Sequence, residues 1–401
     1  MSLHTAESPT PGGSPRRIRV VLTADNHVDL KYQKYPDPVG KRLREERLAA
    51  LERVVTGANQ RRADLLVVAG DLFDGTDDRV TTKMVKATAE VLATFTGDRV
   101  LVLPGNHDYC TGAQSDLWKR FRSETEGSPV LVLDSAEVHQ FTIDEQPVQI
   151  FACPCNSKTS ESNAIGWVRE AQKDPTAIRI GIAHGNVEGL GLDQADRYYN
   201  MTVEELEAAG LHTWLLGHIH RRAPAEAGTG PRSFFMAGST TPESVRRNAP
   251  GSAWSIEIGA TGVVQFEPFQ TGAVSFLRIV REFLPTDGPT DIDALEAELS
   301  VLEANNTVLD LQLAGELAHD GLQRLDDLLQ WVNTRGFIHA SIDRAVNERL
   351  SAELISRLYP AGTLAQRLLN DLLTSSEPGD ATTALLAIKA MQSDTAKRPT
   401  R

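Results

Sequence analysis

The sequence predicts an α/β fold of four layers, helix–sheet–sheet–helix (α/β/β/α), followed by a small α+β domain. Apolar, β-rich runs alternate with helical patterns over residues 17–270, a rhythm typical of parallel strands with helices outside the sheet. A second set of strand and helix patterns begins near residue 275. At 401 residues the chain is long enough for a full α/β core and a second, smaller domain.

The elements of the first segment can be placed from their hydrophobic periods. The expected order is strand 18–24, helix 41–62, strand 64–70, helix 78–95, strand 99–104, strands 130–133, 137–143 and 147–152, helix 161–173, strand 178–183, helix 202–209, and strands 213–217, 233–237, 253–258 and 262–268. Short polar turns separate the three runs between 130 and 152, which indicates an antiparallel meander. The order fits two facing mixed sheets covered by helices.

The second segment has the pattern of a small α+β domain. Its expected strands are "VSFLRIVREF", "NTVLDLQLAGEL" and "GFIHASIDRAV", and its expected helices are "DIDALEAELSVLEA" and "HDGLQRLDDLLQWVNTR". The amphipathic pieces "LAQRLLNDLL" and "TALLAIKAM" follow, and they either pack on their own domain or dock a partner. We therefore divide the chain into a flexible leader at 1–16, a main domain at 17–272, a small α+β domain at 275–346 and a helical segment at 347–401.

Charge and composition narrow the class of protein. The net charge of −13 argues against a protein that grips nucleic acid by bulk electrostatics alone. Basic clusters at 41–47, 119–122, 221–222 and 246–247 are most simply explained as solvated faces. No uninterrupted apolar run approaches the ~20 residues that span a bilayer, and residues 1–17 lack the apolar stretch of a secretory signal. A cytoplasmic location with no membrane partner is expected.

The three cysteines, Cys110, Cys153 and Cys155, are too few for a disulfide framework. Cys153 and Cys155 could bind a soft metal, but no second pair of thiols exists. A buried turn of small residues is the simpler interpretation of this pair.

Five clusters of metal-type ligands follow apolar runs in a fixed order. They are Asp25-Asn26-His27, Gly70-Asp71, Gly105-Asn106-His107-Asp108, His184-Gly185 and Gly217-His218-Ile219-His220. Carboxylate, amide and imidazole groups at the carboxyl ends of buried strands are what a paired divalent-metal site requires. The sequence therefore predicts a dinuclear metal site that hydrolyses phosphoesters.

Individual residues suggest individual roles within this site. A carboxylate such as Asp71 is the natural bridge between two cations, because it shares its negative charge with both. The amide of Asn106 and the scarcity of thiols favour Mn²⁺ or a similar borderline cation over a structural zinc. His107 is expected to point toward the substrate and to protonate the leaving oxygen, with Asp108 orienting its ring. The other histidines are expected to be ordinary surface or core residues: His4, His139, His212, His319 and His339.

The ordered motifs DNH, GDLFD, GNHD, HG and GHIH resemble those of the calcineurin-like metallophosphoesterase superfamily. Within that superfamily, GDLFD and the appended α+β domain are similar to the SbcD-type DNA repair exonucleases of bacteria. The resemblance implies a four-layer metallophosphoesterase sandwich, with Mn²⁺ as the usual activating metal and residues 275–346 as a DNA-capping domain. It also implies two ligand sets and a catalytic histidine at His107. One metal would be held by Asp25, His27, Asp71 and His220, and the other by Asp71, Asn106, His184 and His218.

Two departures from the family pattern bear on substrate choice. Asp74 occupies a position where some relatives of this nuclease class have a second histidine. The loop "AGSTTPESVRRNAPGS" at 237–252 keeps a Gly-Ser turn but differs from the family in detail.

Three functions remain open at this point. The first is a Mn²⁺-dependent DNA exonuclease or endonuclease acting in double-strand-break repair or end processing. Its expected partners are duplex DNA ends, an SbcC-like coiled-coil ATPase and a second copy of the chain. The second is a stand-alone phosphodiesterase or phosphatase for nucleotides or phosphoproteins, which leaves residues 276–401 without a task. The third is a scaffold without catalysis, which the intact His107 and the complete ligand set disfavour.

Overall fold

The computed structural model describes residues 16–112, 115–190, 197–284, 286–349, 351–375, 379, 383–384 and 386–388. The expected leader up to residue 15, with His4, lies outside the described residues. The chain forms two compact units, residues 1–275 and residues 276–401.

The first unit contains a mixed sheet of seven strands, in the order β4-β3-β2-β1-β11-β12-β9. Its strands are β1 (Ile18–Thr23), β2 (Leu65–Ala69), β3 (Arg99–Leu103), β4 (Val130–Val132), β9 (Gly228–Thr229), β11 (Ser252–Gly259) and β12 (Gly262–Gln270). Strands β1 to β4 pair in parallel, whereas β11 pairs antiparallel with both β1 and β12. The carboxyl ends of β1, β2 and β3 therefore lie at the same edge.

A second sheet of five strands has the order β10-β8-β7-β6-β5. Its strands are β5 (Val138–Ile143), β6 (Gln146–Cys153), β7 (Ile178–His184), β8 (Thr213–Gly217) and β10 (Phe234–Met236). All pair in parallel except β5, which forms an antiparallel hairpin with β6. Parallel neighbours again bring the carboxyl ends of β7 and β8 together.

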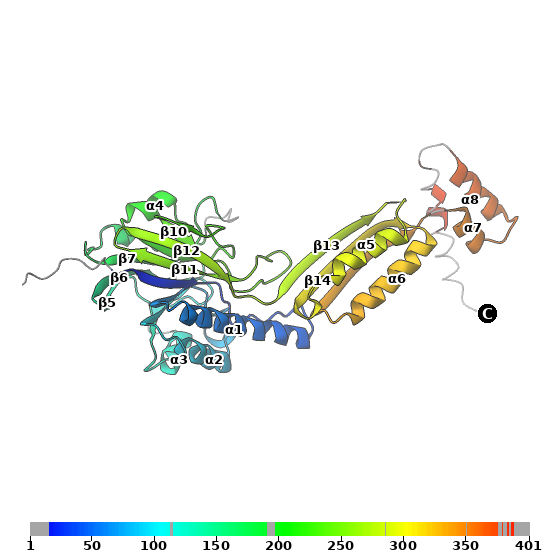
Figure 1. Cartoon of the computed structure of the whole chain (residues 1–401). Coiled ribbons are helices and arrows are strands. Elements are labelled where there is room, and N and C mark those ends of the chain that lie inside the picture. The colour runs from blue at the N-terminus through cyan, green and yellow to red at the C-terminus, as the bar shows by residue number, and fades with distance from the viewer. Residues whose placement is uncertain are drawn as a thin grey trace, which may run out of the picture. The chain divides into compact units, whose positions relative to one another are not determined.

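Three apolar clusters show that the unit has the four expected layers. Alternate residues of β1 and β7, such as Val20 and Ile180, meet in a core between the two sheets. The other face of the first sheet packs on helices α1 (Asp37–Gln60), α2 (Thr82–Ala93) and α3 (Asp116–Glu124), seen below it in Figure 1. The outer face of the second sheet packs on α4 (Val203–Ala208) through residues such as Leu206 and Trp214. The predicted α/β/β/α order is confirmed.

Two local predictions were wrong in this unit, the first being the meander at 130–152. β4 belongs to the seven-stranded sheet and pairs in parallel with β3, whereas β5 and β6 lie in the other sheet. A parallel neighbour needs a crossover element, and α3 provides it. Leu117, Trp118 and Phe121 of α3 are fully buried. The adjacent basic side chains, counted as a charge cluster in the sequence, conceal this short apolar face.

The helix expected at 161–173 is also absent, because only a 3₁₀ turn, η3 (Gly166–Arg169), forms there. The ammonium group of Lys173 donates to the carbonyl oxygens of Val168, Arg169 and Ala171 at 2.7, 3.2 and 3.1 Å. A lysine side chain thus satisfies carbonyl groups that an α-helix would pair with backbone N–H groups, and the chain continues as a loop.

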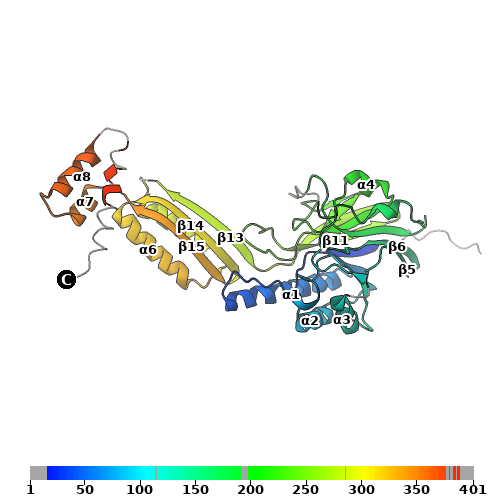
Figure 2. The same ribbon diagram turned by 180° about the vertical axis from the view of Figure 1, so that it is seen from behind.

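The second unit is a three-stranded sheet covered by two helices, in the strand order β13-β14-β15. Its elements are β13 (Ser275–Phe283), α5 (Pro289–Ser300), β14 (Thr307–Leu317), α6 (His319–Thr334) and β15 (His339–Glu348). Buried leucines of both helices, including Leu295 and Leu328, pack against β13 and β14 in a core of their own. Helix α6 lies along β14 and β15, as Figure 2 shows.

Two short helices follow, α7 (Ala352–Leu358) and α8 (Leu364–Thr374), and only the second was expected. Leu369 of α8 packs with Ile355 of α7, whereas Leu364 and Leu368 are 79% and 53% exposed. In the described part of the chain, no helix is both long and apolar enough to cross a membrane.

Candidate metal centre

The seven residues expected as metal ligands all lie at the carboxyl ends of parallel strands. Asp25 and His27 follow β1, Asp71 follows β2, and Asn106 follows β3 in the seven-stranded sheet. From the other sheet, His184 ends β7, and His218 and His220 follow β8. The two sheets thus contribute ligands to one rim of the sandwich.

Four of the seven candidate ligands have a strained backbone. Their φ values lie in the left-handed region, which residues other than glycine seldom adopt. The values are 51° for Asp25, 44° for His27, 53° for Asp71 and 102° for His218. Such residues cost about 1–3 kcal/mol each and persist only where surrounding contacts fix them. Here the amide of His27 donates to the carbonyl of Asp71 at 3.0 Å. The amide of His218 donates to both carboxylate oxygens of Asp25 at 3.1 Å.

Two glycines allow the clusters to approach one another. A Cβ atom on Gly70, whose φ is +91°, would lie 2.1 Å from Nδ1 of His184. A Cβ atom on Gly105 would lie 2.3 Å from Oδ1 of Asp71. Both positions require glycine because the space belongs to a candidate ligand.

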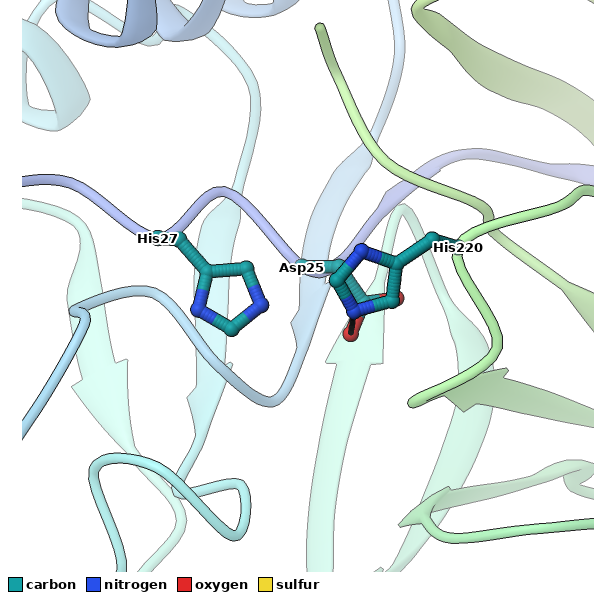
Figure 3. A group of neighbouring side chains, drawn as sticks. All are labelled: Asp25, His27 and His220. Carbon is teal, nitrogen blue, oxygen red and sulfur yellow. Dashed lines mark ion pairs between the residues drawn. The ribbon is translucent and has the colours of Figure 1, made fainter. Parts of the chain in front are cut away.

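Asp25, His27 and His220 form the first group of candidate ligands (Figure 3). Each offers a donor atom, and these atoms lie within 4.8 Å of one another. The rings of His27 and His220 are stacked, with their centroids 5.1 Å apart. Nε2 of His27 lies 3.6 Å from Oδ2 of Asp71, which connects this group to the second one.

The second group surrounds Asp71, and its members Asp71, Asn106 and His184 are 2% exposed or less. Nε2 of His184 lies 3.3 Å from Oδ2 of Asp71 and 3.1 Å from Oδ1 of Asn106. Nδ1 of His218 lies 3.1 Å from the same amide oxygen. The other nitrogen of His184, Nδ1, lies 2.8 Å from the carbonyl oxygen of Ala69, a partner that fixes the orientation of the ring. Asp71 therefore stands between the two groups, where a bridging ligand is required.

The electrostatics of the cluster favour an ionised Asp71, whereas burial raises the pKa of Asp25. Burial opposes the charge of Asp71, but His184, His27 and His107 together hold its pKa well below the usual range. Burial also opposes the charge of His184, yet Asp71 and Asp25 raise its pKa to about 9. Burial lowers the pKa of His218 to about 3, so its imidazole is neutral at pH 7. A cation that binds His184 would displace the proton from its ring. Cation affinity would therefore rise with pH.

An unsatisfied nitrogen and the types of donor atom show that the cluster fits divalent cations. Nε2 of His27 makes no hydrogen bond although the side chain is only 2% exposed, and its neighbouring carboxylate oxygens, on Asp71 and Glu243, lie 3.6 and 3.7 Å away. Buried nitrogens of this kind are costly unless a ligand engages them. The donors are carboxylate oxygens, an amide oxygen and imidazole nitrogens without a thiolate, a set suited to borderline divalent ions.

His107 lies beside the cluster and is the most accessible of its histidines. Its side chain is 39% exposed, its ring meets that of His27 edge-on at 4.7 Å, and its amide donates to Asp71 at 2.8 Å. Oδ1 of Asp74 lies 3.3 Å from Nδ1 of His107 and 3.2 Å from Nδ1 of His27. Burial alone would raise the pKa of Asp74, but the contacts with His107 and His27 lower it to about 2.

The orienting role expected of Asp108 falls by geometry to Asp74. The Asp108 carboxylate accepts the amides of Gly105 and Phe73 at 2.7 and 3.0 Å, so it fixes the loop and not the His107 ring. Burial, with the charge of Asp71, raises the pKa of Asp108 to about 7. Chain adjacency suggested Asp108, whereas its fully buried side chain turns toward the backbone.

Sequence patterns missed a buried network behind the first group. Oε1 of Glu243 lies 3.0 Å from Nδ1 of His220, 3.7 Å from Nε2 of His27 and 3.4 Å from Nη2 of Arg47. Arg47 is fully buried and donates to the hydroxyl of Tyr32 at 3.0 Å and to the carbonyl of Asn26 at 2.8 Å. The only signal was the departure of the 237–252 loop from the family pattern. Arg47 had been placed with the solvated charges of residues 41–47.

The cysteines and two of the other histidines have no part in the candidate metal centre. Cys110, Cys153 and Cys155 are free and buried, and burial raises the pKa of all three thiols. His139 contacts Glu137, and His319 contacts Glu348, at 3.6 and 3.4 Å.

The part of the chain that carries the candidate ligands matches a known protein family. The calcineurin-like phosphoesterase family matches residues 18–222, just over half of the 401 residues. The uncharacterized metallophosphoesterase YhaO of Bacillus subtilis (strain 168) is 26% identical over 213 residues, which cover 51% of this chain and 49% of that protein. The match thus spans about half of that relative's length.

Two solved structures resemble the chain more distantly. The protein TT1561 of Thermus thermophilus aligns with a TM-score of 0.38 and 11% identity, over 64% of this chain and 100% of that one. A dimetal phosphatase from Danio rerio aligns with a TM-score of 0.36 and 13% identity, over 63% of this chain and 99% of that one. On the match over residues 18–222, the chain belongs to the calcineurin-like phosphoesterase family and is a metallophosphoesterase.

Proposed function

We propose that the protein is an SbcD-type, Mn²⁺-dependent nuclease that hydrolyses phosphodiester bonds of DNA in the cytoplasm, together with a coiled-coil ATPase. The observation that supports hydrolysis of a diester most directly is the position of His107. Its ring is 39% exposed beside a buried cluster of carboxylates and imidazoles, and Asp74 contacts Nδ1. Nε2 is therefore the nitrogen left to protonate a leaving alkoxide, which is a poor leaving group without a proton.

The residues of the cluster divide the remaining work. Asp25, His27, Asp71 and His220 would hold one cation, and Asp71, Asn106, His184 and His218 the other. When bound, such cations polarise a phosphoryl oxygen and make water a stronger nucleophile near neutral pH. Gly70 and Gly105 let the ligands converge, and the buried carbonyl of Ala69 holds His184 in one orientation. His107 supplies the proton, and Asp74 keeps its ring in place.

Support for DNA as the substrate comes from the second unit. Residues 276–401 form a separate unit, and its sheet and two helices have a core of their own. A small phosphomonoester needs no such unit, whereas a nuclease that must select and open a duplex end does. Leu364 and Leu368 of α8 are exposed, which supports a helical attachment to a partner such as an ATPase.

The choice of metal gives the first test. After removal of metal with EDTA, Mn²⁺ should restore the highest turnover of a small chromogenic phosphodiester, above Mg²⁺ and Ca²⁺. An amide and four imidazoles beside two carboxylates suit a borderline cation better than a hard one. Equal turnover in EDTA after exhaustive dialysis would rule out the dinuclear mechanism.

A truncated chain ending at Ser275 separates the nuclease from a stand-alone phosphodiesterase. The truncation keeps the amide of Ala273 bonded to Glu46 and the whole candidate metal centre. It should still cleave the small diester, but it should digest linear duplex DNA poorly and fail to bind a coiled-coil ATPase partner. A cooperative melt first confirms that it folds. If it digests duplex DNA as fast as the full chain, the stand-alone phosphodiesterase is the better function.

A further inference from the structure

A cleft of about 870 Å³ opens beside the candidate metal centre. Three loops of the first unit line it, at residues 30–34, 74–81 and 243–247. Two of its lining residues, Asp74 and Glu243, contact the histidines of the centre. A ligand in this cleft would therefore be continuous with a phosphate held at the metals. The volume lies in the range of pockets that enclose a ligand much larger than one phosphate ion.

Four cationic side chains line the cleft, and two of them are paired. Nζ of Lys31 lies 2.7 Å from Asp29, and Nη1 of Arg247 lies 3.1 Å from Glu243. Lys34 and Arg79 make no ion pair with any described residue. Nζ of Lys34 lies 5.0 Å from the centre of the Tyr35 ring. These two charges remain available to an anionic ligand.

The walls of the cleft are held in place before a ligand arrives. Asp29, only 5% exposed, accepts the amide of Thr81 at 2.9 Å and so joins the loop after β1 to the loop before α2. A Cβ atom on Gly75 would lie 2.8 Å from Cβ of Arg79, so the glycine lets the arginine stem pack next to Asp74. Little ordering of loops would be required on binding, which favours affinity.

The acidic residues of the cleft leave room for an anion. Of its three carboxylates, Asp74 contacts His27 and His107, and Glu243 contacts His220, Arg47 and Arg247. Asp78 makes no ion pair with a described residue, so its charge alone opposes an anion directly. The side chain of Tyr32 is 7% exposed and its hydroxyl is engaged by Arg47, so it offers no open face on which a base could stack.

We propose that this cleft binds the phosphate groups next to the scissile one in a single nucleic-acid strand, through Lys34 and Arg79 and without regard to base sequence. The proposal rests on the proposed function, because it supplies the subsite that a phosphodiester polymer needs and a small phosphoester does not. A strand end drawn along the cleft would leave its next phosphate at the metals.

The test measures binding of a fluorescein-labelled 12-mer of thymidylate to the full chain in EDTA, by anisotropy at several salt concentrations. Each phosphate neutralised on a single strand contributes about 0.7 to the slope of log K against log salt. The double variant K34Q/R79Q should lower the slope by about 1.4 and weaken binding at least about tenfold at low salt. A 12-mer of deoxyadenylate should give the same slopes.

Matched variants make the result specific to the cleft. K86Q/K119Q also removes two positive charges, from lysines of α2 and α3 that are 61% and 53% exposed, and should keep the wild-type slope. The charge-retaining K34R/R79K should restore binding, and Asp78→Asn should tighten it. An unchanged slope in K34Q/R79Q, or the same loss in K86Q/K119Q, would overturn the proposal. So would competition by inorganic triphosphate as effective as that by unlabelled 12-mer, since the cleft would then serve isolated phosphates.

The outcomes also separate this proposal from the proposed function. Binding is measured without metal and does not depend on hydrolysis. If the protein hydrolyses DNA but K34Q/R79Q keeps the wild-type slope, the proposal for the cleft fails and the proposed nuclease function stands. If binding depends on the cleft but the protein hydrolyses no diester in Mn²⁺, the nuclease function fails and the proposal for the cleft stands.

Discussion

Replacing Arg47 with methionine should destabilise the first unit by about 3 kcal/mol while keeping most of the volume of the side chain. The guanidinium is fully buried and makes two hydrogen bonds, to Tyr32 and Asn26, besides its contact with Glu243. Removing one partner of a buried ion pair typically costs about 3–5 kcal/mol. We expect the lower end of this range because the Glu243 carboxylate would still contact His220 at 3.0 Å and Arg247 at 3.1 Å.

Urea unfolding followed by tryptophan fluorescence measures this cost. Trp118, Trp214 and Trp254 are buried in the first unit, so the signal reports chiefly on it. The midpoint should fall at an unchanged slope, which indicates a change in stability alone. Arg44→Met is the control, because Arg44 lies one turn earlier on α1 and makes one hydrogen bond, to the carbonyl of Lys31 at 3.0 Å. It should cost about 1 kcal/mol or less.

Combining Arg47→Met with Glu243→Gln tests whether the lost contact between the two side chains causes the loss of stability. Burial opposes the charge of Glu243, but His220, His27 and Arg47 hold its pKa well below 4.5, the usual value for a glutamate. Its contribution to stability is therefore complete above pH 4.5 and is lost as the pH falls through the lowered pKa. The double variant should cost less than the sum of the single ones. A cost below about 1 kcal/mol for Arg47→Met, or strict additivity, would refute the argument.

Three further changes address the centre itself. His107→Ala should lower kcat for a small diester by a factor of about 10²–10⁴ and keep both metal equivalents in elemental analysis. The control His319→Ala, at a similar exposure of 41%, should change neither kcat nor the metal content. Loss of one metal equivalent in His107→Ala would show that His107 is a ligand. Asp71→Asn should abolish binding of both metals, because the bridge is lost, and retention of one would contradict a bridging role. Asp74→Asn should move the high-pH limb of kcat/KM to lower pH. Burial lowers the pKa of His107, but Asp74, Asp71 and Asp108 raise it, so without Asp74 the proton is lost earlier; an unmoved limb would remove Asp74 from catalysis.

The fold and the ligand set followed from the sequence because both depend on local patterns. Buried strands have a clear hydrophobic period, and a polar cluster directly after each strand must lie at the same edge when the strands are parallel. Helix α3 was missed because its three buried residues lie among lysine and arginine side chains. The orienting role expected of Asp108, the last residue of the motif GNHD, differs from the structure for another reason. Whether Asp74 or Asp108 faces His107 depends on the direction of each side chain in a loop, where no period exists.

Arg47 and Glu243 illustrate what a single sequence cannot show. They are 196 positions apart and meet only because β1, α1 and the 237–252 loop converge. Residue type gives no hint of the pairing, because charged residues in a helix or loop usually face solvent. The contact is a product of tertiary structure alone.

The division of the ligands between the two sheets has a consequence for the life of the protein in the cell. Asp25, Asp71 and Asn106 extend from one sheet, and His184, His218 and His220 from the other. Ions bound among them would act as cross-links that close the sandwich along one edge, and a site filled at about 100 times its Kd adds about 2.7 kcal/mol to stability. A cell short of the metal would then lose the polypeptide as well as its activity, because the open edge is a starting point for unfolding and proteolysis. Metal supply would set the abundance of the protein.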